Sequence, residues 1–279
     1  MLLVSSVLAA SGWIFSLQAL SGLPPFFFIG TRFVIAGLLI GLVSRLHGVR
    51  LSDLWVSLPG AVALGLSMMA WITGLQHTSN PGVAAFISGC GNLMMPIFGL
   101  LLYRWPVGRR MWQALAIALV GLGLLFLNGS ARMEIGNLWF VVASSLWGLG
   151  MVISRQGLER VGVMTLTALQ LVLSGALILA ASAAVETWPR TLPALPVIEA
   201  FVGAVLLATC GRFLLQLKGQ HMLSPGRAAV FLTLEPVWTL VASMTLLGTT
   251  ITPIQLAGCA VLLSAMVFVL LPSRQTPAG

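Results

Sequence analysis

One carboxylate stands almost alone in the last third of the chain. Glu235 is the sole charged side chain between Ala228 and Pro272. The candidate cationic partners are Arg212, in the preceding predicted helix, and Arg227, about two helical turns before Glu235. The sequence leaves several roles open for this carboxylate: a buried ion pair, a hydrogen bond to neighbouring backbone, a proton acceptor, or a contact to the amine of a substrate.

Other polar side chains recur at helical spacing inside apolar stretches. Ser88 and Asn92 are four residues apart and share one helix face, and Thr209, Arg212 and Gln216 form a second polar stripe. An arginine at the edge of a cavity suits a ligand carboxylate. The alternative for the first group is close helix packing, because Ser88 lies beside glycines that let backbones approach.

Tryptophans well inside the apolar stretches need an acceptor for their indole N–H groups. Trp71 shares a helix face with Ser67 and Met68, and such a surface suits an aromatic or thioether ligand. Each tryptophan is also compatible with ordinary core packing, but several together favour a lined cavity. The candidate substrate-binding residues are Trp13, Ser67, Met68, Trp71, Ser88, Asn92, Trp147, Thr209, Arg212, Gln216, Glu235 and Trp238.

The composition requires a membrane around these residues. Of 279 residues, 58% are hydrophobic and 7% are charged, whereas soluble domains carry roughly 25% charged residues. The apolar segments lack the alternation of a membrane barrel, so we predict an all-α integral membrane protein. Turn signals and charged loops divide the chain into ten predicted transmembrane helices, at about 1–21, 26–45, 54–76, 81–103, 110–128, 135–155, 161–185, 195–217, 225–247 and 252–272.

The basic residues predict the orientation of the chain. A net charge of +8 would indicate nucleic acid in a soluble protein, but here the position of each base matters more. If the N-terminus is cytoplasmic, the outer loops carry only Arg132 and Arg190. The inner loops then carry Arg45, Arg50, Arg104, Arg109, Arg110, Arg155, Arg160, Lys218 and Arg274. This asymmetry predicts a multi-pass inner-membrane protein with both termini in the cytoplasm, and it gives no reason to expect nucleic acid.

The chain repeats itself. Residues 75–86, LQHTSNPGVAAF, match residues 219–230, GQHMLSPGRAAV, and the Gly-Ala-Val at Gly60 matches the one at Gly203. Each half holds five predicted helices, an odd number, so the second half is inverted in the membrane. We expect repeats over 1–130 and 131–279, related as in transporters that work by alternating access. The duplication favours a self-sufficient monomer.

The residues resemble a known family. Thr31-Arg32-Phe33, Pro81-Gly82, Trp147 and Leu234-Glu235-Pro236-Val237 are similar to the drug/metabolite transporter superfamily with two EamA-type repeats. Among its branches, the chain resembles most the bacterial aromatic amino-acid exporters. That resemblance implies outward transport of aromatic and other neutral amino acids. The chain departs from this family at the end of the fourth predicted helix, where Tyr103-Arg104 replace the Gly-Glu of many relatives.

Competing classes fit less well. An intramembrane enzyme needs catalytic groups such as paired aspartates or a zinc motif, and the chain's one aspartate, Asp53, lies in a predicted loop. Neither a catalytic residue nor a metal site is predicted, and no cofactor is expected. Export of cationic drugs or other metabolites remains the alternative within the superfamily. The sequence leaves the choice between uniport and proton coupling open.

Overall fold

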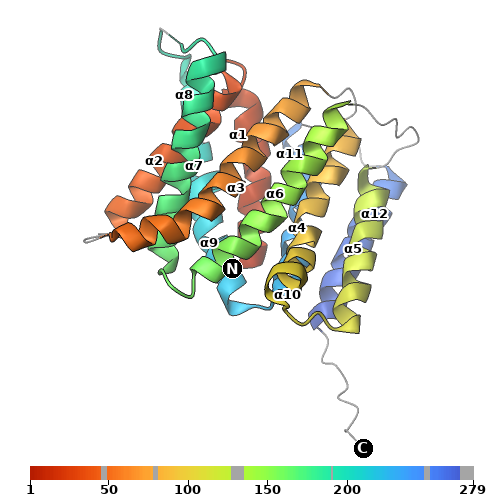
Figure 1. Cartoon of the computed structure of the whole chain (residues 1–279). Helices are drawn as coiled ribbons and strands as arrows, with labels where there is room; N and C mark the ends of the chain where they lie inside the picture. Colours follow the sequence, from red (N-terminus) through yellow and green to blue (C-terminus); the bar gives the residue numbers. More distant parts are fainter. Residues whose placement is uncertain (45–48, 78–80, 127–134, 190, 248–251, 271–279) are drawn as a thin grey trace, which may run out of the picture.

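The computed structural model describes residues 1–44, 49–77, 81–126, 135–189, 191–247 and 252–270, and these form helices without a strand. Figure 1 shows the helices as a bundle of long, tilted rods. In chain order they are α1 Leu2–Ala19, α2 Pro25–Val43, α3 Leu51–Gln76, α4 Pro81–Tyr103, α5 Arg109–Phe126, α6 Ile135–Gly157, α7 Val163–Val185, α8 Leu195–Val205, the π-helix η1 Leu206–Gly211, α9 Arg212–Met222, α10 Pro225–Leu232, α11 Glu235–Leu247 and α12 Pro253–Leu270.

The surface of the bundle is apolar, as contact with lipid requires. Large side chains such as Leu42, Leu101 and Val120 are 76%, 69% and 58% exposed, respectively. Water would make such a surface aggregate, whereas lipid tails solvate it. Within the described residues, seven helical segments are long and apolar enough to cross a membrane. They are Pro25–Val43, Leu51–Gly74, Phe86–Tyr103, Ile135–Gly157, Val163–Val185, Leu195–Met222 and Pro253–Leu270.

The predicted eighth helix contains a change of helix type. It extends to Met222, beyond the expected end at 217, and its middle, η1, is π-helical. The hydroxyl of Thr209 donates to the carbonyl of Ala204 at 2.8 Å, five residues back, in keeping with the wider π turn. Single π turns inside α-helices often mark functional sites, and Arg212 follows this one directly.

The predicted ninth helix is interrupted beside Glu235. α10 ends at Leu232 and α11 begins at Glu235, with Thr233 and Leu234 forming the turn between them. Pro236 is the cause, since it has no N–H to donate to the carbonyl of Leu232. A proline inside a membrane helix is expected to bend the helix or to free a carbonyl, and at Pro236 the helix is interrupted. At Pro96 the helix α4 continues through the proline.

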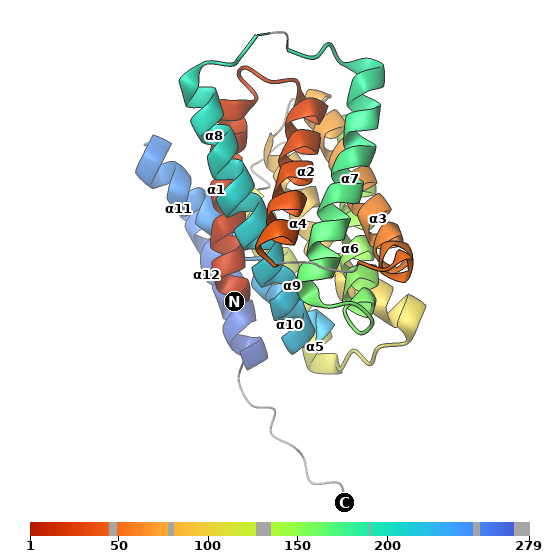
Figure 2. The same cartoon turned by 90° about the vertical axis from the view of Figure 1, so that its left-hand side faces the viewer.

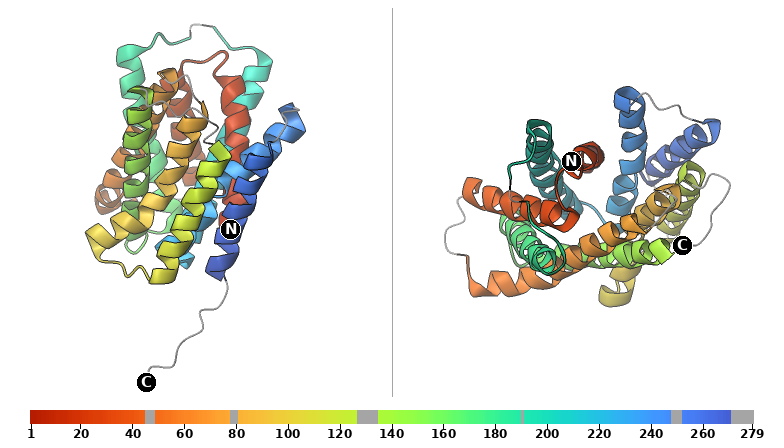
Figure 3. Two further views of the ribbon diagram at one scale, coloured as in Figure 1. Left: turned by 90° about the vertical axis from the view of Figure 1, so that its right-hand side faces the viewer. Right: turned by 90° about the horizontal axis from the view of Figure 1, so that it is seen from above.

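The helices pack in pairs that join the two halves of the chain. α2 lies against α7, α3 against α6, and α5 against α12, while α1 contacts α8, η1, α9 and α11. Figure 2 shows α2 and α7 side by side, and Figure 3 shows α5 beside α12 at one edge of the bundle. Glu186, which directly follows α7, links α7 to the start of α2. Its carboxylate accepts hydrogen bonds from the N–H groups of Phe26 and Phe27, both at 2.8 Å. It therefore caps the first turn of α2.

Candidate functional site

A cavity of about 430 Å³ lies between the two halves of the chain. Pockets of roughly 300–1,000 Å³ are typical for small ligands. Its lining side chains come from α1–α4, α6, η1, α9 and α11. The lining residues are Ala9, Gly12, Ser16, Leu20, Phe28, Ile29, Arg32, Ser67, Met68, Trp71, Ile72, Ser88, Gly89, Asn92, Phe140, Ala143, Ser144, Trp147, Ala208, Arg212, Glu235, Pro236 and Thr239.

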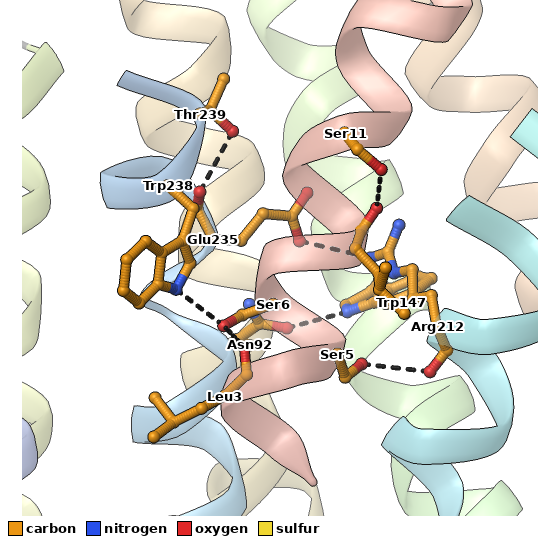
Figure 4. Close-up of polar contacts among 11 residues, drawn as sticks. Leu3, Ser5, Ser6, Ser11, Asn92, Trp147, Arg212, Glu235, Trp238 and Thr239 are labelled. Atoms are coloured by element: carbon orange, nitrogen blue, oxygen red, sulfur yellow. Dashed lines mark hydrogen bonds and ion pairs between the residues drawn. The ribbon is translucent and has the colours of Figure 1, made fainter. Parts of the chain in front are cut away.

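Arg212 and Glu235 form an ion pair in the wall of this cavity. Arg212 Nη2 lies 3.3 Å from Glu235 Oε2, and the two side chains are 20% and 22% exposed. Figure 4 shows the contact between α9 and α11 beside α1. The helix interruption starts α11 at the glutamate itself, and η1 ends just before the arginine. Of the two candidate partners that the sequence offers, Arg212 is the one that pairs with Glu235, whereas Arg227 is exposed.

Trp147 joins three walls of the cavity. Its indole nitrogen donates to Asn92 Oδ1 at 3.0 Å, from α6 to α4 (Figure 4). The Arg212 guanidinium carbon lies 5.3 Å from the Trp147 ring centroid, within the range of a cation–π contact. The ring also packs edge-on against Phe213, with centroids 6.3 Å apart. Trp147 is therefore held in one orientation by polar and aromatic contacts together.

Two glycines bring α4 and α6 close enough for this arrangement. A Cβ atom at Gly148 would lie 2.6 Å from Met94 Cβ and 2.9 Å from the Gly91 carbonyl oxygen. At Gly91 it would lie 3.2 Å from Ser144 Cα. These glycines directly precede Asn92 and follow Trp147 in sequence. Close backbone approach at this crossing is what places the tryptophan within hydrogen-bonding distance of the asparagine.

The remaining wall is largely apolar, with a few hydroxyl groups. Trp71 and Met68 of α3 line it, as the shared helix face predicted. The hydroxyl of Ser67 donates a hydrogen bond to the carbonyl of Ala143 at 2.8 Å, and this bond links α3 to α6. The hydroxyl of Ser88 is buried and has no hydrogen-bond partner among the described residues. A ligand with an apolar side chain and a small polar end matches such a wall.

The structure places most of the sequence-predicted residues together. Those that line the cavity are Ser67, Met68, Trp71, Ser88, Asn92, Trp147, Arg212 and Glu235. Thr209 and Trp238 do not line it. Thr209 is fully buried in the π turn, and the Trp238 indole donates to Ser6 Oγ at 3.0 Å on α1. The side chain of Trp13 lies outside the described residues.

Gln216 lies at a second, smaller cavity. This space measures about 30 Å³ and is lined by Gln216, Gln170, Gln220 and Ser154, together with Trp147. Trp147 therefore separates the two cavities and contributes to both. The smaller space has room for no more than about two or three waters, since one water needs roughly 10–15 Å³, and it is too small for a substrate.

Arg32 is the main residue that the sequence reasoning missed. Its position near the outer end of the helix is compatible with a side chain that snorkels there, but Arg32 is 9% exposed and lines the cavity. The signal was present, because Arg32 is the first charged side chain of the chain and the sole one before Arg45. The same isolation singled out Glu235. Ser16 and Thr239, also in the lining, carry no comparable sequence signal.

The fold and the cavity define a class: a multi-helix membrane protein with an apolar outer surface and a central cavity that holds a few charged and polar side chains. The model of the EamA-like transporter family matches residues 1–127 and again residues 134–271, so the chain belongs to that family and contains two EamA domains. This membership supports a membrane transporter that acts on a small molecule in a lipid bilayer, and it points away from an enzyme.

Relatives and a solved structure agree with this assignment. The chain is 27% identical over 270 residues to the uncharacterized inner membrane transporter YedA of Escherichia coli strain K12, covering 91% of this chain and 84% of the relative. It is 25% identical over 278 residues to the uncharacterized transporter YvbV of Bacillus subtilis strain 168, covering 96% and 89%. One crystal structure superposes with a TM-score of 0.83 at 18% identity, covering 97% of each chain, which shows the shared fold. These findings support a multi-pass inner-membrane protein.

Proposed function

We propose that this protein exports small amphipathic metabolites, chiefly aromatic and other neutral amino acids, through its central cavity. The observation that carries the proposal is the composition of the cavity wall. Trp71, Trp147 and Met68 offer apolar and aromatic surface, while Arg212 and Glu235 place both signs of charge in the same wall. Aromatic surface beside groups of both charges suits a zwitterion with an aromatic side chain.

The proposal includes ten membrane spans in two inverted five-helix repeats. The helix contacts support this arrangement. If the two halves are equivalent, α1, α2, α3, α4 and α5 correspond in order to α6, α7, α8–α9, α10–α11 and α12. Each contact between the halves should then have a counterpart between the corresponding helices. The α3·α6 contact has its counterpart in the contacts of α1 with α8 and α9. The α4·α6 contact has its counterpart in those of α1 with α10 and α11. Such pseudo-symmetry lets two halves exchange conformations and expose a central site alternately to each side.

Export is defined only once the orientation of the chain in the membrane is known. We propose repeats over 1–130 and 131–279, with both termini in the cytoplasm, because the basic residues then lie almost entirely on the inner side. The cavity is built within one chain, so a monomer suffices for transport. The charge pair leaves both uniport and proton coupling chemically open.

Export of cationic drugs is the second candidate, since Glu235 offers a carboxylate to an ammonium group. The arginines weaken this candidate, because a permanent cation would meet two positive charges in the same cavity.

Substrate-driven exchange in proteoliposomes tests the class of substrate. Vesicles loaded with unlabelled L-phenylalanine, choline or a nucleotide sugar are diluted into the matching radiolabelled compound, with and without a pH gradient. We expect accumulation of label for L-phenylalanine and for other neutral amino acids. Movement of a quaternary ammonium compound or a nucleotide sugar, with no amino acid moved, would show the proposal to be wrong.

A further inference from the structure

Arg32 is a buried cation that the described protein leaves without a counter-charge. It lies on α2, and its Nη1 donates one long hydrogen bond of 3.4 Å to Ser16 Oγ. Its Nε is buried without a hydrogen-bond partner in the described part of the chain. No carboxylate oxygen of the described residues lies within 4.0 Å of the guanidinium. A guanidinium carries five N–H donors in a planar fork, so the described residues use little of its hydrogen-bonding capacity.

Aromatic rings hold the guanidinium in place. Its central carbon lies 5.1 Å from the ring centroid of Phe28 and 5.3 Å from that of Phe33. Phe33 is fully buried, and Phe28 is 1% exposed. These contacts restrict the guanidinium to a position beside the cavity, which Arg32 and Phe28 both line. An arginine fixed in this manner loses little conformational entropy when it binds a ligand.

The charges of the cavity wall do not balance. Among its described lining residues the charged side chains are Arg32, Arg212 and Glu235, two cations and one anion, giving a net charge of +1. Glu235 is already paired with Arg212 at 3.3 Å. Arg212 carries the same charge as Arg32 and lines the same cavity. In an apolar surrounding, a cation with this deficit favours an anion strongly.

We infer that Arg32 binds the carboxylate of the transported molecule. This inference rests on the proposed function and makes it narrower, because it requires a substrate that carries a carboxylate and not merely an aromatic ring. A carboxylate accepts two parallel N–H bonds from an arginine fork, which adds geometric selectivity to the charge interaction. The apolar side chain of the substrate then lies against the wall formed by Met68 and Trp71, which line the same cavity.

The test is competition binding on purified protein with L-phenylalanine and three analogues that each lack one group. L-Phenylalaninamide lacks the carboxylate charge, phenethylamine lacks the carboxyl group, and 3-phenylpropanoate lacks the amine. For the unmodified protein we expect about 10- to 100-fold weaker binding of the first two compounds than of L-phenylalanine, as the loss of a charge-assisted hydrogen-bond pair predicts. In Arg32→Gln this preference should fall to about threefold or less, and Arg32→Lys should retain an intermediate preference.

A matched control is Arg110→Gln. Like Arg32, Arg110 contacts a phenylalanine ring, at 4.9 Å from the Phe268 centroid, and has a buried Nε without a partner among the described residues. It does not line the cavity. Its substitution should leave the preference of L-phenylalanine over its amide unchanged. Size-exclusion profiles and melting temperatures of all variants report folding. Should Arg32→Gln fail to fold, the comparison of the unmodified protein with Arg32→Lys decides.

The outcomes separate this inference from the proposed function. The inference is wrong, and the proposed function stands, if Arg32→Gln binds L-phenylalanine with unchanged affinity and unchanged preference over the amide. If Arg32→Gln does not fold, the same result for Arg32→Lys has the same meaning. If 3-phenylpropanoate binds in an Arg32-dependent manner and L-phenylalanine does not, the carboxylate site is supported and the amino-acid assignment is wrong. Binding of phenethylamine in preference to both acids would contradict the inference and the proposed function together.

Discussion

The indole nitrogen of Trp147 lies 3.0 Å from Oδ1 of Asn92 and donates a hydrogen bond across the contact between α6 and α4. Trp147 also lies beside the Arg212 guanidinium and separates the central cavity from the smaller one lined by Gln216. One side chain thus connects the aromatic wall, the charge pair and the helix crossing.

Trp147→Phe should weaken substrate binding while the protein stays folded. The substitution keeps an aromatic ring but removes the hydrogen bond to Asn92, which costs about 1 kcal/mol of stability. It also frees Asn92 and reshapes the wall that meets the substrate, so we expect roughly fivefold weaker binding. Trp238→Phe is a matched control, since its indole also donates a 3.0 Å hydrogen bond, to Ser6, away from the cavity. Equal loss of affinity in both variants would assign Trp147 to the core and not to the site.

Gly148→Ala should impair folding or transport, because the added methyl group would force α6 away from Met94 and the backbone of Gly91. Overpacking of this kind typically costs about 1–3 kcal/mol, which a lowered melting temperature would report. The comparison is Gly162→Ala, where a Cβ atom meets no other atom within 4 Å. A Gly148→Ala variant as stable and active as Gly162→Ala would show that the close crossing is not required.

Glu235→Gln should retain substantial substrate exchange at neutral pH. The amide keeps an oxygen that can accept from Arg212, and the pair is partly exposed to the cavity, so the expected cost is about 1 kcal/mol or less and about fivefold in rate at most. Glu199→Gln on the exposed face of α8 is the control for a lost negative charge. If Glu235→Gln folds and exchanges substrate yet loses a response to a pH gradient that the unmodified protein shows, Glu235 couples transport to protons.

Arg104→Gly should stabilise the protein. Arg104 has φ of 52° after the last residue of α4, and its N–H bonds the Leu100 carbonyl at 3.0 Å, as at a left-handed helix terminus. Glycine adopts this conformation without the strain that a Cβ atom brings, and the gain is about 1 kcal/mol. Arg104→Ala removes the same charge but keeps the Cβ atom, so its melting temperature should not rise. A rise in Arg104→Ala equal to that in Arg104→Gly would assign the effect to charge.

The sequence predicted the helices and many of the residues that line the central cavity, because both depend on local patterns. Apolar stretches bounded by turn residues specify membrane helices directly, and an isolated charge such as Glu235 must find a partner such as Arg212. The ends of the helices agree to within a few residues over most of the described chain.

The direction of individual side chains was less predictable. Arg32 and Trp238 lie at depths that suited snorkelling and a cavity, respectively, but packing turned the first inward and the second toward Ser6. Similarly, nothing in the local sequence distinguishes the π turn at Thr209 from ordinary helix. Pro96 also gives no local signal that α4 continues through it, whereas the helix is interrupted at Pro236. These features depend on neighbouring helices that a single stretch of sequence does not specify.

The most direct test of the central claim is exchange of L-phenylalanine by proteoliposomes containing either the unmodified protein or Trp71→Ala, a substitution in the apolar wall of the cavity. The account predicts saturable exchange that other neutral amino acids inhibit, and at least about tenfold slower exchange for Trp71→Ala, since the loss of a large aromatic contact costs more than 1.4 kcal/mol. The amount of folded Trp71→Ala in the vesicles should equal that of the unmodified protein. No exchange of any amino acid by the folded, unmodified protein would contradict the account, and so would undiminished exchange by Trp71→Ala.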